Sequence, residues 1–275
     1  ESAQDSLPTI NKPDLQYYDQ QVQLSQNALE QLRLNSTIID IGAIEGLNTI
    51  KIDDQKIRIG PLVTHSDIEN SQEIRSTIPI LSTIAKFIAH PTIRNRGTFC
   101  GSLAHADPLA EWPCVLLGMK GIVKATSIRG ERSIDARDFF QTIFSTSLDT
   151  DEIITEAIIP ISATNNSWVF QEVSKQDGAF GLVFVLVGGL KSNAGLVEDV
   201  TTVIGGCGDV PLMPSVDRSI IVGKLPTKKL IEQFANEIVE SLDPLSDLNA
   251  SKGDRIKMTR TLLIRSLTEA LSLRD

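Results

Sequence analysis

The segment between Thr92 and Pro113 holds the residue types of this chain that are best suited to bind a ligand. Its centre contains Gly97, Thr98 and the pair Gly101-Ser102, which predict a turn whose backbone N–H groups can surround an anion. Glycine lets a ligand approach the backbone closely, and the threonine and serine hydroxyls add hydrogen-bond donors. The segment therefore indicates a site for a ligand that carries phosphates and hydroxyls.

Two carboxylates follow this turn at a spacing of four residues. Asp107 and Glu111 stand at the start of an apolar segment, residues 109–119, that predicts a helix. An acid at this point favours the helix dipole, and it can equally accept hydrogen bonds from ribityl or ribose hydroxyls. A structural alternative is a surface loop that Asp107 caps and that Pro108 stiffens at the first helical position. Both interpretations stay open on the residues alone.

The other reactive residue types form no recognisable set. Cys100, Cys114 and Cys207 are widely spaced, without the Cys-x-x-Cys pattern of a zinc site or an iron–sulfur cluster. The three histidines are scattered, and no nucleophile–base pair or carboxylate pair can be assigned. We therefore expect no catalytic residue and no metal ligand here. This pattern fits a protein whose chemistry is carried out by a bound cofactor.

Length and composition exclude several classes of protein. The chain has 275 residues, 41% of them hydrophobic, which is enough for more than one domain. Its net charge is −9, without a basic stripe, so we expect no nucleic acid partner. No apolar run approaches the roughly 18 residues of a membrane span. The odd number of cysteines favours a reducing compartment, the cytoplasm.

The periodicity of apolar residues predicts an α+β protein with two units joined at a polar linker, residues 162–167. The first unit is expected to hold strands at 36–41, 56–63, 122–127 and 151–160, and helices that start at Pro79 and cover 109–119. The second is expected to hold an antiparallel sheet of strands at 168–173, 182–190 and 200–204, covered by helices at 228–242 and 255–273.

An ordered series of motifs resembles the FAD-binding medium subunits of the molybdenum hydroxylases, the group of carbon monoxide dehydrogenase, xanthine dehydrogenase and aldehyde oxidoreductase. The segment 92–113, with its Ala-Asp-Pro at 106–108, is similar to the second flavin motif of that family. Other similar segments follow in the family's order: residues 57–65, 151–154, 159–160, 170–173, 178–183, 204–208 and 255–267. The resemblance covers about residues 32–275.

The resemblance implies a fold and a role. The fold would be an FAD-binding domain of the PCMH type at 1–161, with lobes at about 1–55 and 56–161 and an atypical N-terminal lobe, followed by a C-terminal α+β domain at 166–275. Electrons would pass from a large molybdopterin subunit, through 2Fe-2S clusters on a small subunit, to FAD and then to NAD, a quinone or oxygen. The chain alone would not act on an organic substrate.

The resemblance also implies which residues touch FAD. Thr98, Gly101 and Ser102 match the phosphate-side turn, with Cys100 inside it, and Glu111 matches an acid that contacts the polyol chain. Asp107 would be either a contact or a cap. The remaining matches are Ile154 and Ile88 as residues that pack on the flavin ring, Gln171 at a position that is Lys in some relatives, and Arg94 and Arg96, which either touch FAD or hold the loop.

The chain departs from the family pattern at two places. Cys100 stands where the family usually has glycine, which predicts a turn that holds the ligand less closely. The glycine-rich first flavin motif is missing: residues 2–11 are a faint echo that contains Asp5, or the motif is deleted before Leu32. The alternative function is therefore a non-enzymatic structural subunit of the same fold with weak or lost flavin binding.

Overall fold

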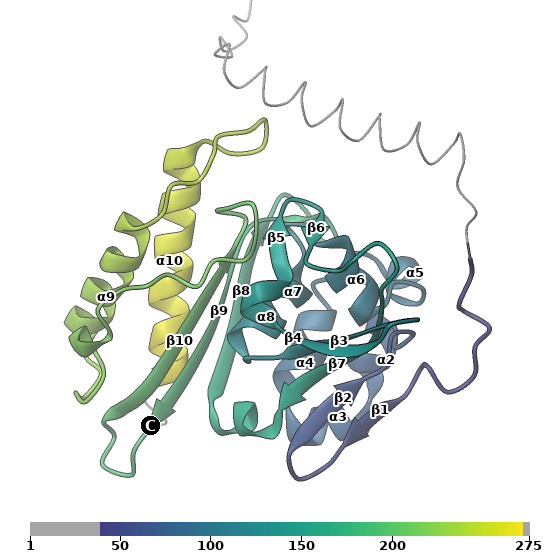
Figure 1. Ribbon diagram of the computed structural model, residues 1–275. Coiled ribbons are helices and arrows are strands. Elements are labelled where there is room, and N and C mark those ends of the chain that lie inside the picture. Colours follow the sequence, from purple (N-terminus) through teal and green to yellow (C-terminus); the bar gives the residue numbers. More distant parts are fainter. Residues whose placement is uncertain (1–38, 272–275) are drawn as a thin grey trace, which may run out of the picture.

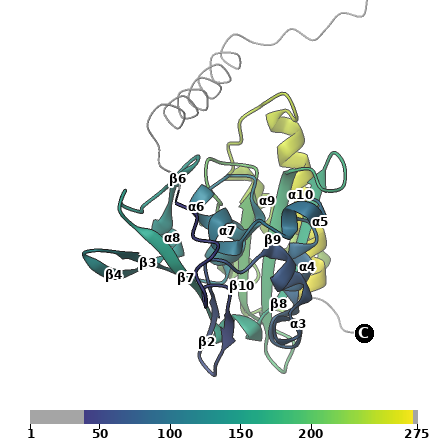
Figure 2. The same cartoon turned by 90° about the vertical axis from the view of Figure 1, so that its right-hand side faces the viewer.

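The computed structural model describes residues 39–271, which form two α+β units packed side by side (Figures 1 and 2). The first unit runs to residue 165 and the second begins at β8. The α+β class and the antiparallel C-terminal sheet with its helices confirm the predicted fold class. Both alternatives for the missing first flavin motif concern residues 1–38 and lie outside the described part of the chain.

The first unit is built on a five-stranded antiparallel sheet. Its order is β1-β2-β7-β3-β4, with bounds Ile50–Ile52, Lys56–Ile59, Ile153–Pro160, Ile122–Ser127 and Gly130–Asp135. Alternation fixes the faces, because Val123 and Ala125 of β3 are fully buried while their neighbours are partly exposed. The strand predicted at 122–127 is confirmed. The expected lobe boundary near residue 55 falls in the turn between β1 and β2, which pair within this sheet.

Short helices pack on this sheet and supply the connections (Figure 1). They are α2 (His65–Asn70), α3 (Gln72–Thr77), α4 (Pro79–Ala85), α5 (Pro91–Arg94), α6 (Phe99–His105), α7 (Glu111–Gly118) and α8 (Ala136–Phe139), and a small hairpin is formed by β5 (Phe140–Thr142) and β6 (Ser145–Thr146). The predicted helix start at Pro79 is confirmed. The strand expected at 36–41 is wrong for its described part, because residues 39–41 form no strand.

The second unit has three antiparallel strands in the order β10-β9-β8, Val197–Gly205, Gly181–Lys191 and Ser167–Ser174. Helices α9 (Lys228–Glu240) and α10 (Lys252–Leu271) cover one face of this sheet, as predicted (Figure 1). Two short 3₁₀ turns lie outside these elements: Ile161–Asn165 ends the first unit and overlaps the predicted linker, and Arg218–Ile220 follows β10.

The other face of the second sheet packs against α7, which makes the largest contact between the units, and against α4. A Cβ on Gly118 of α7 would lie 3.0 Å from Val203 and 3.1 Å from Leu186, so a larger residue would require these two side chains to shift. All eight residues of α7 are buried. The helix therefore ties the candidate site at its N-terminus to the second unit. Between residues 39 and 271, no helix is long and apolar enough to cross a membrane.

Candidate functional site

The small-residue turn is the first turn of α6. Thr98 is its N-cap, and the hydroxyl of Thr98 accepts a hydrogen bond from the Gly101 N–H at 2.9 Å. The Phe99 N–H donates to the Val63 carbonyl at 3.0 Å, and the Ser102 N–H donates to the Thr98 carbonyl at 3.0 Å. The sequence predicted a non-helical turn with free amides. Three of those amides are instead used within the protein, because a threonine at this position starts a helix.

Cys100 points away from the outer face of this turn. Its side chain is 2% exposed, and its sulfur lies 3.7 Å from the Ile59 carbonyl oxygen and 3.8 Å from that of Gly60. Burial raises the pKa of the thiol to about 12. The thiol therefore fills the core next to β2, and it does not occupy the space beside Gly101 that the sequence analysis expected it to crowd.

His65 and Trp112 pack against the buried side of the small-residue turn. The Trp112 Nε1–H donates to His65 Nδ1 at 2.9 Å, and both side chains are buried. Burial, with the nearby positive charge of Arg94, lowers the pKa of His65 to about 4, so the imidazole is neutral near pH 7. A Cβ on Gly97 would lie 2.7 Å from His65 Nε2, and the ring of Phe99 lies 4.8 Å from that of Trp112. Nothing in the sequence pairs His65 with Trp112, because the two residues are 47 positions apart in the chain.

Gly101→Ala is expected to lower the free energy of unfolding by about 1 kcal/mol, the typical worth of an N-cap. The new Cβ would lie 2.7 Å from the Thr98 hydroxyl and displace it from the cap. Gly253→Ala is the matched control, because a Cβ there meets nothing closer than 3.9 Å and should raise stability slightly. Urea unfolding midpoints measure both. Equal shifts of the same sign would contradict this account of the turn.

Asp107 closes the turn between α6 and α7. Its Oδ1 accepts a hydrogen bond from the Leu109 N–H at 2.8 Å, and its carbonyl accepts one from the Ala110 N–H at 3.0 Å. The helix begins at Glu111 and not at Pro108, so the expectation that Pro108 holds the first helical position is wrong. Asp107 acts as a local cap of this turn.

Glu111 is the buried acid of the site. Its residue is 6% exposed, and its carboxyl makes no hydrogen bond or ion pair to another residue of the described range. Burial, reinforced by the negative charge of Glu172, raises the pKa of Glu111 to about 8. The protonated carboxyl therefore predominates near neutral pH, and it can both donate and accept a hydrogen bond.

Glu172, and not Gln171, faces this acid. Along β8, Gln171 shares the face of Val169 and Val173, which pack in the core under α9 and α10. Glu172 lies on the opposite face with Phe170, which packs in the core of the first unit. Its Oε2 is buried without a hydrogen-bond partner, and burial raises its pKa to about 7. The period of two along residues 168–173 was the signal that could have identified Glu172.

Ile88 and Arg94 belong to the loop that follows α4. The Arg94 guanidinium donates to the carbonyls of Ile88 and Ala89 at 3.2 and 2.8 Å and pairs with Glu69 at 2.8 Å. Of its two expected roles, Arg94 therefore holds the loop. Ile88 is partly buried against the core of the first unit.

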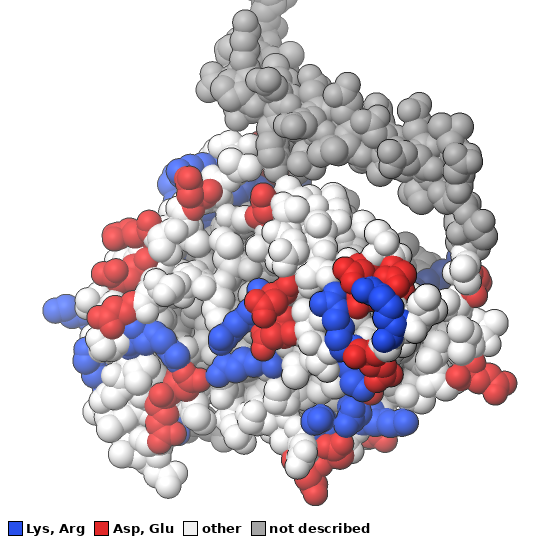
Figure 3. Space-filling view, in the orientation of Figure 1, with Lys and Arg blue, Asp and Glu red and all other residues white. Residues whose placement is uncertain are grey.

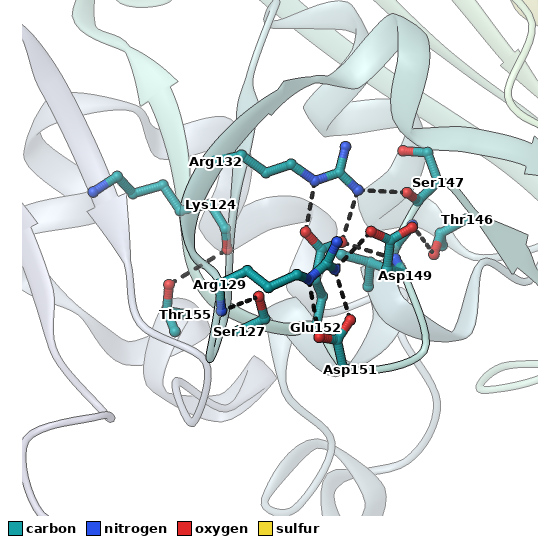
Figure 4. A network of polar contacts seen from close by, with 11 residues as sticks. Lys124, Ser127, Arg129, Arg132, Thr146, Ser147, Asp149, Asp151, Glu152 and Thr155 are labelled. Carbon is teal, nitrogen blue, oxygen red and sulfur yellow. Dashed lines mark hydrogen bonds and ion pairs between the residues drawn. The ribbon is translucent and has the colours of Figure 1, made fainter.

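Ile154 lies in the core of the first unit. It is 7% exposed, whereas the preceding Ile153 is 55% exposed. A network of ion pairs fixes the loop before β7: Arg132 binds both oxygens of Glu152 at 2.6 and 2.7 Å, and Arg129 bridges two aspartates (Figure 4). The hydrogen bond from Arg132 lowers the pKa of Glu152 to about 2. This network holds the loop that leads into β7, in which Ile154 pairs with Ala125 of β3.

A hollow of about 500 Å³ opens beside Thr98. Thr64, Arg96 and the loop at residues 42–48 form most of its wall. Asp67 also lines it, but its carboxylate already accepts from the Thr64 hydroxyl and N–H at 2.7 and 2.9 Å. One cation, two hydroxyls and the carboxylates of Asp67 and Glu45 thus line a space large enough for part of a nucleotide. The described residues contain no group of three side chains suited to hold a metal ion.

Comparison with known proteins decides the family. The model of the family described as "FAD binding domain in molybdopterin dehydrogenase" matches residues 22–162, and that of the "CO dehydrogenase flavoprotein C-terminal domain" matches residues 168–270. The chain belongs to the FAD-binding medium subunits of the molybdenum hydroxylases. It is therefore an oxidoreductase subunit of a molybdenum hydroxylase complex, as the resemblance predicted.

Individual medium subunits show the extent of the similarity. The nicotine 6-hydroxylase medium subunit of Paenarthrobacter nicotinovorans is 36% identical over 236 residues, which cover 86% of this chain and 82% of that protein. The 6-hydroxypseudooxynicotine dehydrogenase complex subunit alpha of the same organism is 35% identical over 242 residues, 86% and 80% of the two chains. The crystal structure of quinoline 2-oxidoreductase from Pseudomonas putida 86 contains a chain with a TM-score of 0.82 and 27% identity, at 90% and 86% coverage.

Proposed function

We propose that this medium subunit binds FAD between the hollow beside Thr98 and the buried carboxyl of Glu111. The observation that carries the proposal is Glu111 itself, a buried acid at the start of α7 whose carboxyl is hydrogen-bonded only to its own backbone N–H within the described part of the chain. An isolated buried carboxyl is costly unless a ligand hydroxyl completes its hydrogen bonds. The polyol chain of a flavin nucleotide offers such hydroxyls.

The residues around the hollow fit the phosphate end of FAD. Arg96 supplies a positive charge, and the Thr64 and Thr98 hydroxyls line the same wall. Glu45 also lines the hollow and would oppose an anion. In this proposal Ser102 and Gly101 lie along the cofactor, Ile88 packs near its ring, and Ile154 supports the ring from the core. FAD, when bound, supplies a group that takes up electrons singly and delivers them in pairs.

The proposed electron path runs through partner subunits. A small subunit with 2Fe-2S clusters would deliver electrons that originate at the molybdenum cofactor of a large subunit, and NAD, a quinone or oxygen would accept them. Family membership supports this path. The three cysteines of this chain are buried and unpaired, which supports a cytoplasmic location.

Glu111→Ala is expected to reduce FAD retention by tenfold or more, whereas Asp107→Ala should reduce it only slightly. Two neutral hydrogen bonds between the protonated carboxyl and polyol hydroxyls, at about 0.5–1.5 kcal/mol each, correspond to about tenfold in affinity, whereas a local cap contributes about 1 kcal/mol of folding stability rather than binding. Flavin content after gel filtration measures both variants. Glu111→Gln, which keeps a donor and an acceptor, should retain more flavin than Glu111→Ala. Equal loss in the Asp107 and Glu111 alanine variants would contradict the assigned roles.

The complex that contains this chain should hold FAD less tightly than relatives with a glycine-rich first motif. Two missing hydrogen bonds to phosphate oxygens, at about 1.5–3 kcal/mol each, correspond to a loss of affinity of about 100-fold or more. The visible flavin spectrum of the native complex, before and after extensive dilution, tests the proposal. Complete absence of flavin from the assembled complex would favour the alternative, a structural subunit of the same fold.

A further inference from the structure

The junction of the two units contains a second hollow, of about 500 Å³, at the far end of α7 from Glu111. Lys120 and Arg137 of the first unit form one wall, and Thr201, Thr202, Ser215 and Arg218 of the second unit contribute to the other. We call it the junction cleft. Helix α7 has eight residues, so about 12 Å separates the cleft from Glu111 at 1.5 Å per residue.

The charge of this cleft is opposite to that of the chain. Its lining includes three cationic side chains, of which only Arg218 is paired with an acid of the described range, Asp199, and it includes no carboxylate, although the net charge of the chain is −9. In the space-filling view, Lys and Arg side chains lie over the region between β10 and α8, next to a group of acidic side chains (Figure 3). Each of the other described hollows is lined by at least one acid. Such a local excess of positive charge attracts anions.

The backbone holds the two cations of the first wall together. Lys120 follows the end of α7 with a left-handed φ of 55°, a conformation that costs a non-glycine residue about 1–2 kcal/mol. The Ala136 N–H donates to the Gly121 carbonyl at 3.0 Å, which fixes α8, and with it Arg137, beside Lys120. Neither the ammonium of Lys120 nor the guanidinium of Arg137 has a polar partner among the residues that the structure describes; only the backbone N–H of Arg137 is bound, by Asp135.

The opposite wall is rigid and polar. Arg218 pairs with Asp199 and donates to the Val200 carbonyl at 2.7 Å, so its guanidinium is anchored to the edge strand β10. Thr201 and Thr202 of the same strand both line the cleft, but successive strand residues point to opposite faces, so only Thr201, on the face of Val203, directs its hydroxyl toward the first unit. Cations and hydroxyls that converge from two sides are the groups that bind phosphate oxygens.

We propose that the junction cleft binds a small anion that carries phosphate groups, at a site separate from the flavin. The volume suits a ligand from inorganic pyrophosphate up to a nucleoside diphosphate. Because both units contribute walls, a bound anion would also link the first unit to the second.

The test is isothermal titration calorimetry of the full chain with sodium pyrophosphate at constant ionic strength. The wild-type chain should bind one equivalent, and the double variant Lys120→Gln/Arg137→Gln should bind about 100-fold more weakly, since each lost charged contact is worth about tenfold. Lys86→Gln/Lys257→Gln removes the same charge from exposed sites and should bind normally. Unfolding midpoints of all variants establish that they are folded.

Two further titrations distinguish binding in the junction cleft from binding beside Thr98, and a nucleotide from a free phosphate compound. Arg96→Gln removes the cation of the hollow beside Thr98, and it should leave pyrophosphate binding intact; loss of binding in this variant instead would overturn the proposal. Titration with ADP distinguishes a nucleotide from a free phosphate compound, because tighter binding of ADP identifies the nucleotide as the ligand and equal binding identifies the free anion. Failure of the wild-type chain to bind either compound, with binding of a polyglutamate peptide, would replace the small anion by an acidic protein segment.

Discussion

Trp112→Ala is expected to lower the free energy of unfolding by about 3–5 kcal/mol, the range for loss of a large buried aromatic side chain. Trp112 is fully buried, packs on Phe99 and donates its indole N–H to His65. The substitution leaves a cavity and also removes the hydrogen-bond donor of a buried imidazole. Phe99 directly follows Thr98, and Gly97 packs on His65. The substitution therefore also removes packing contacts beneath the small-residue turn at the start of α6.

Trp112→Phe separates these two effects. It keeps an aromatic ring near Phe99 but leaves His65 Nδ1 without its donor, so a smaller loss of about 1–3 kcal/mol is expected. Chemical unfolding with flavin-free protein measures both variants, and flavin content of the folded variants measures the effect on the turn. If the free energy of unfolding of Trp112→Ala lies within about 1 kcal/mol of the wild-type value, His65 and Trp112 do not support the turn.

The buried carboxyl of Glu111 should make the stability of this protein depend on pH. The stability of the flavin-free chain is expected to fall as the pH rises from 6.5 to 8, and Glu111→Gln should remove most of this dependence. The pKa of Glu111 is raised from its ordinary 4.5 to about 8 by burial, so the folded state holds a proton that the unfolded state has released. Stability from this group is complete below pH 4.5 and is lost as the pH rises through about 8. The total is on the order of 2–5 kcal/mol.

Between pH 6.5 and 8, the change in stability comes from the buried carboxyls and not from His65. The pKa of His65 is lowered to about 4, so its contribution is present above pH 6.5 and is lost only as the pH falls toward 4. Glu172, whose pKa is raised to about 7, acts in the same direction as Glu111, so Glu172→Gln should remove a further part of the slope. Glu237→Gln removes an exposed carboxyl of α9 and should leave the slope unchanged. A wild-type stability that rises with pH in this window would disprove the buried carboxyl pair.

The sequence was a good guide wherever the determining pattern was local. The apolar stripe of α9 and the alternation of β3 specify their own secondary structure, and the structure has both elements where they were expected. The order of the flavin motifs along the chain was sufficient to indicate the family, because an ordered set over more than 200 residues is specific in a way that a single turn is not.

Tertiary structure decided what no local pattern contains. The direction of the Cys100 side chain depends on a carbonyl of β2 about forty residues away, and Arg94 is committed to the loop by Glu69. Near Thr98, local chemistry and fold disagree: a glycine-rich segment suggested free amides, but the N-cap and the Val63 carbonyl occupy three of them.

Two further pairs of residues, Glu111 with Glu172 and Lys120 with Arg137, are close in space for reasons that the sequence does not contain. Glu111 and Glu172 are brought together only because α7 packs against the second sheet, and that contact buries both without a cation. Lys120 and Arg137 meet because the Ala136 amide binds the Gly121 carbonyl. The sequence by itself determined the elements and the family of this protein, since both depend on residue order. Which charges face each other, and in what degree of burial, was decided by the packing of distant segments, because burial and Coulomb interactions are properties of three-dimensional proximity.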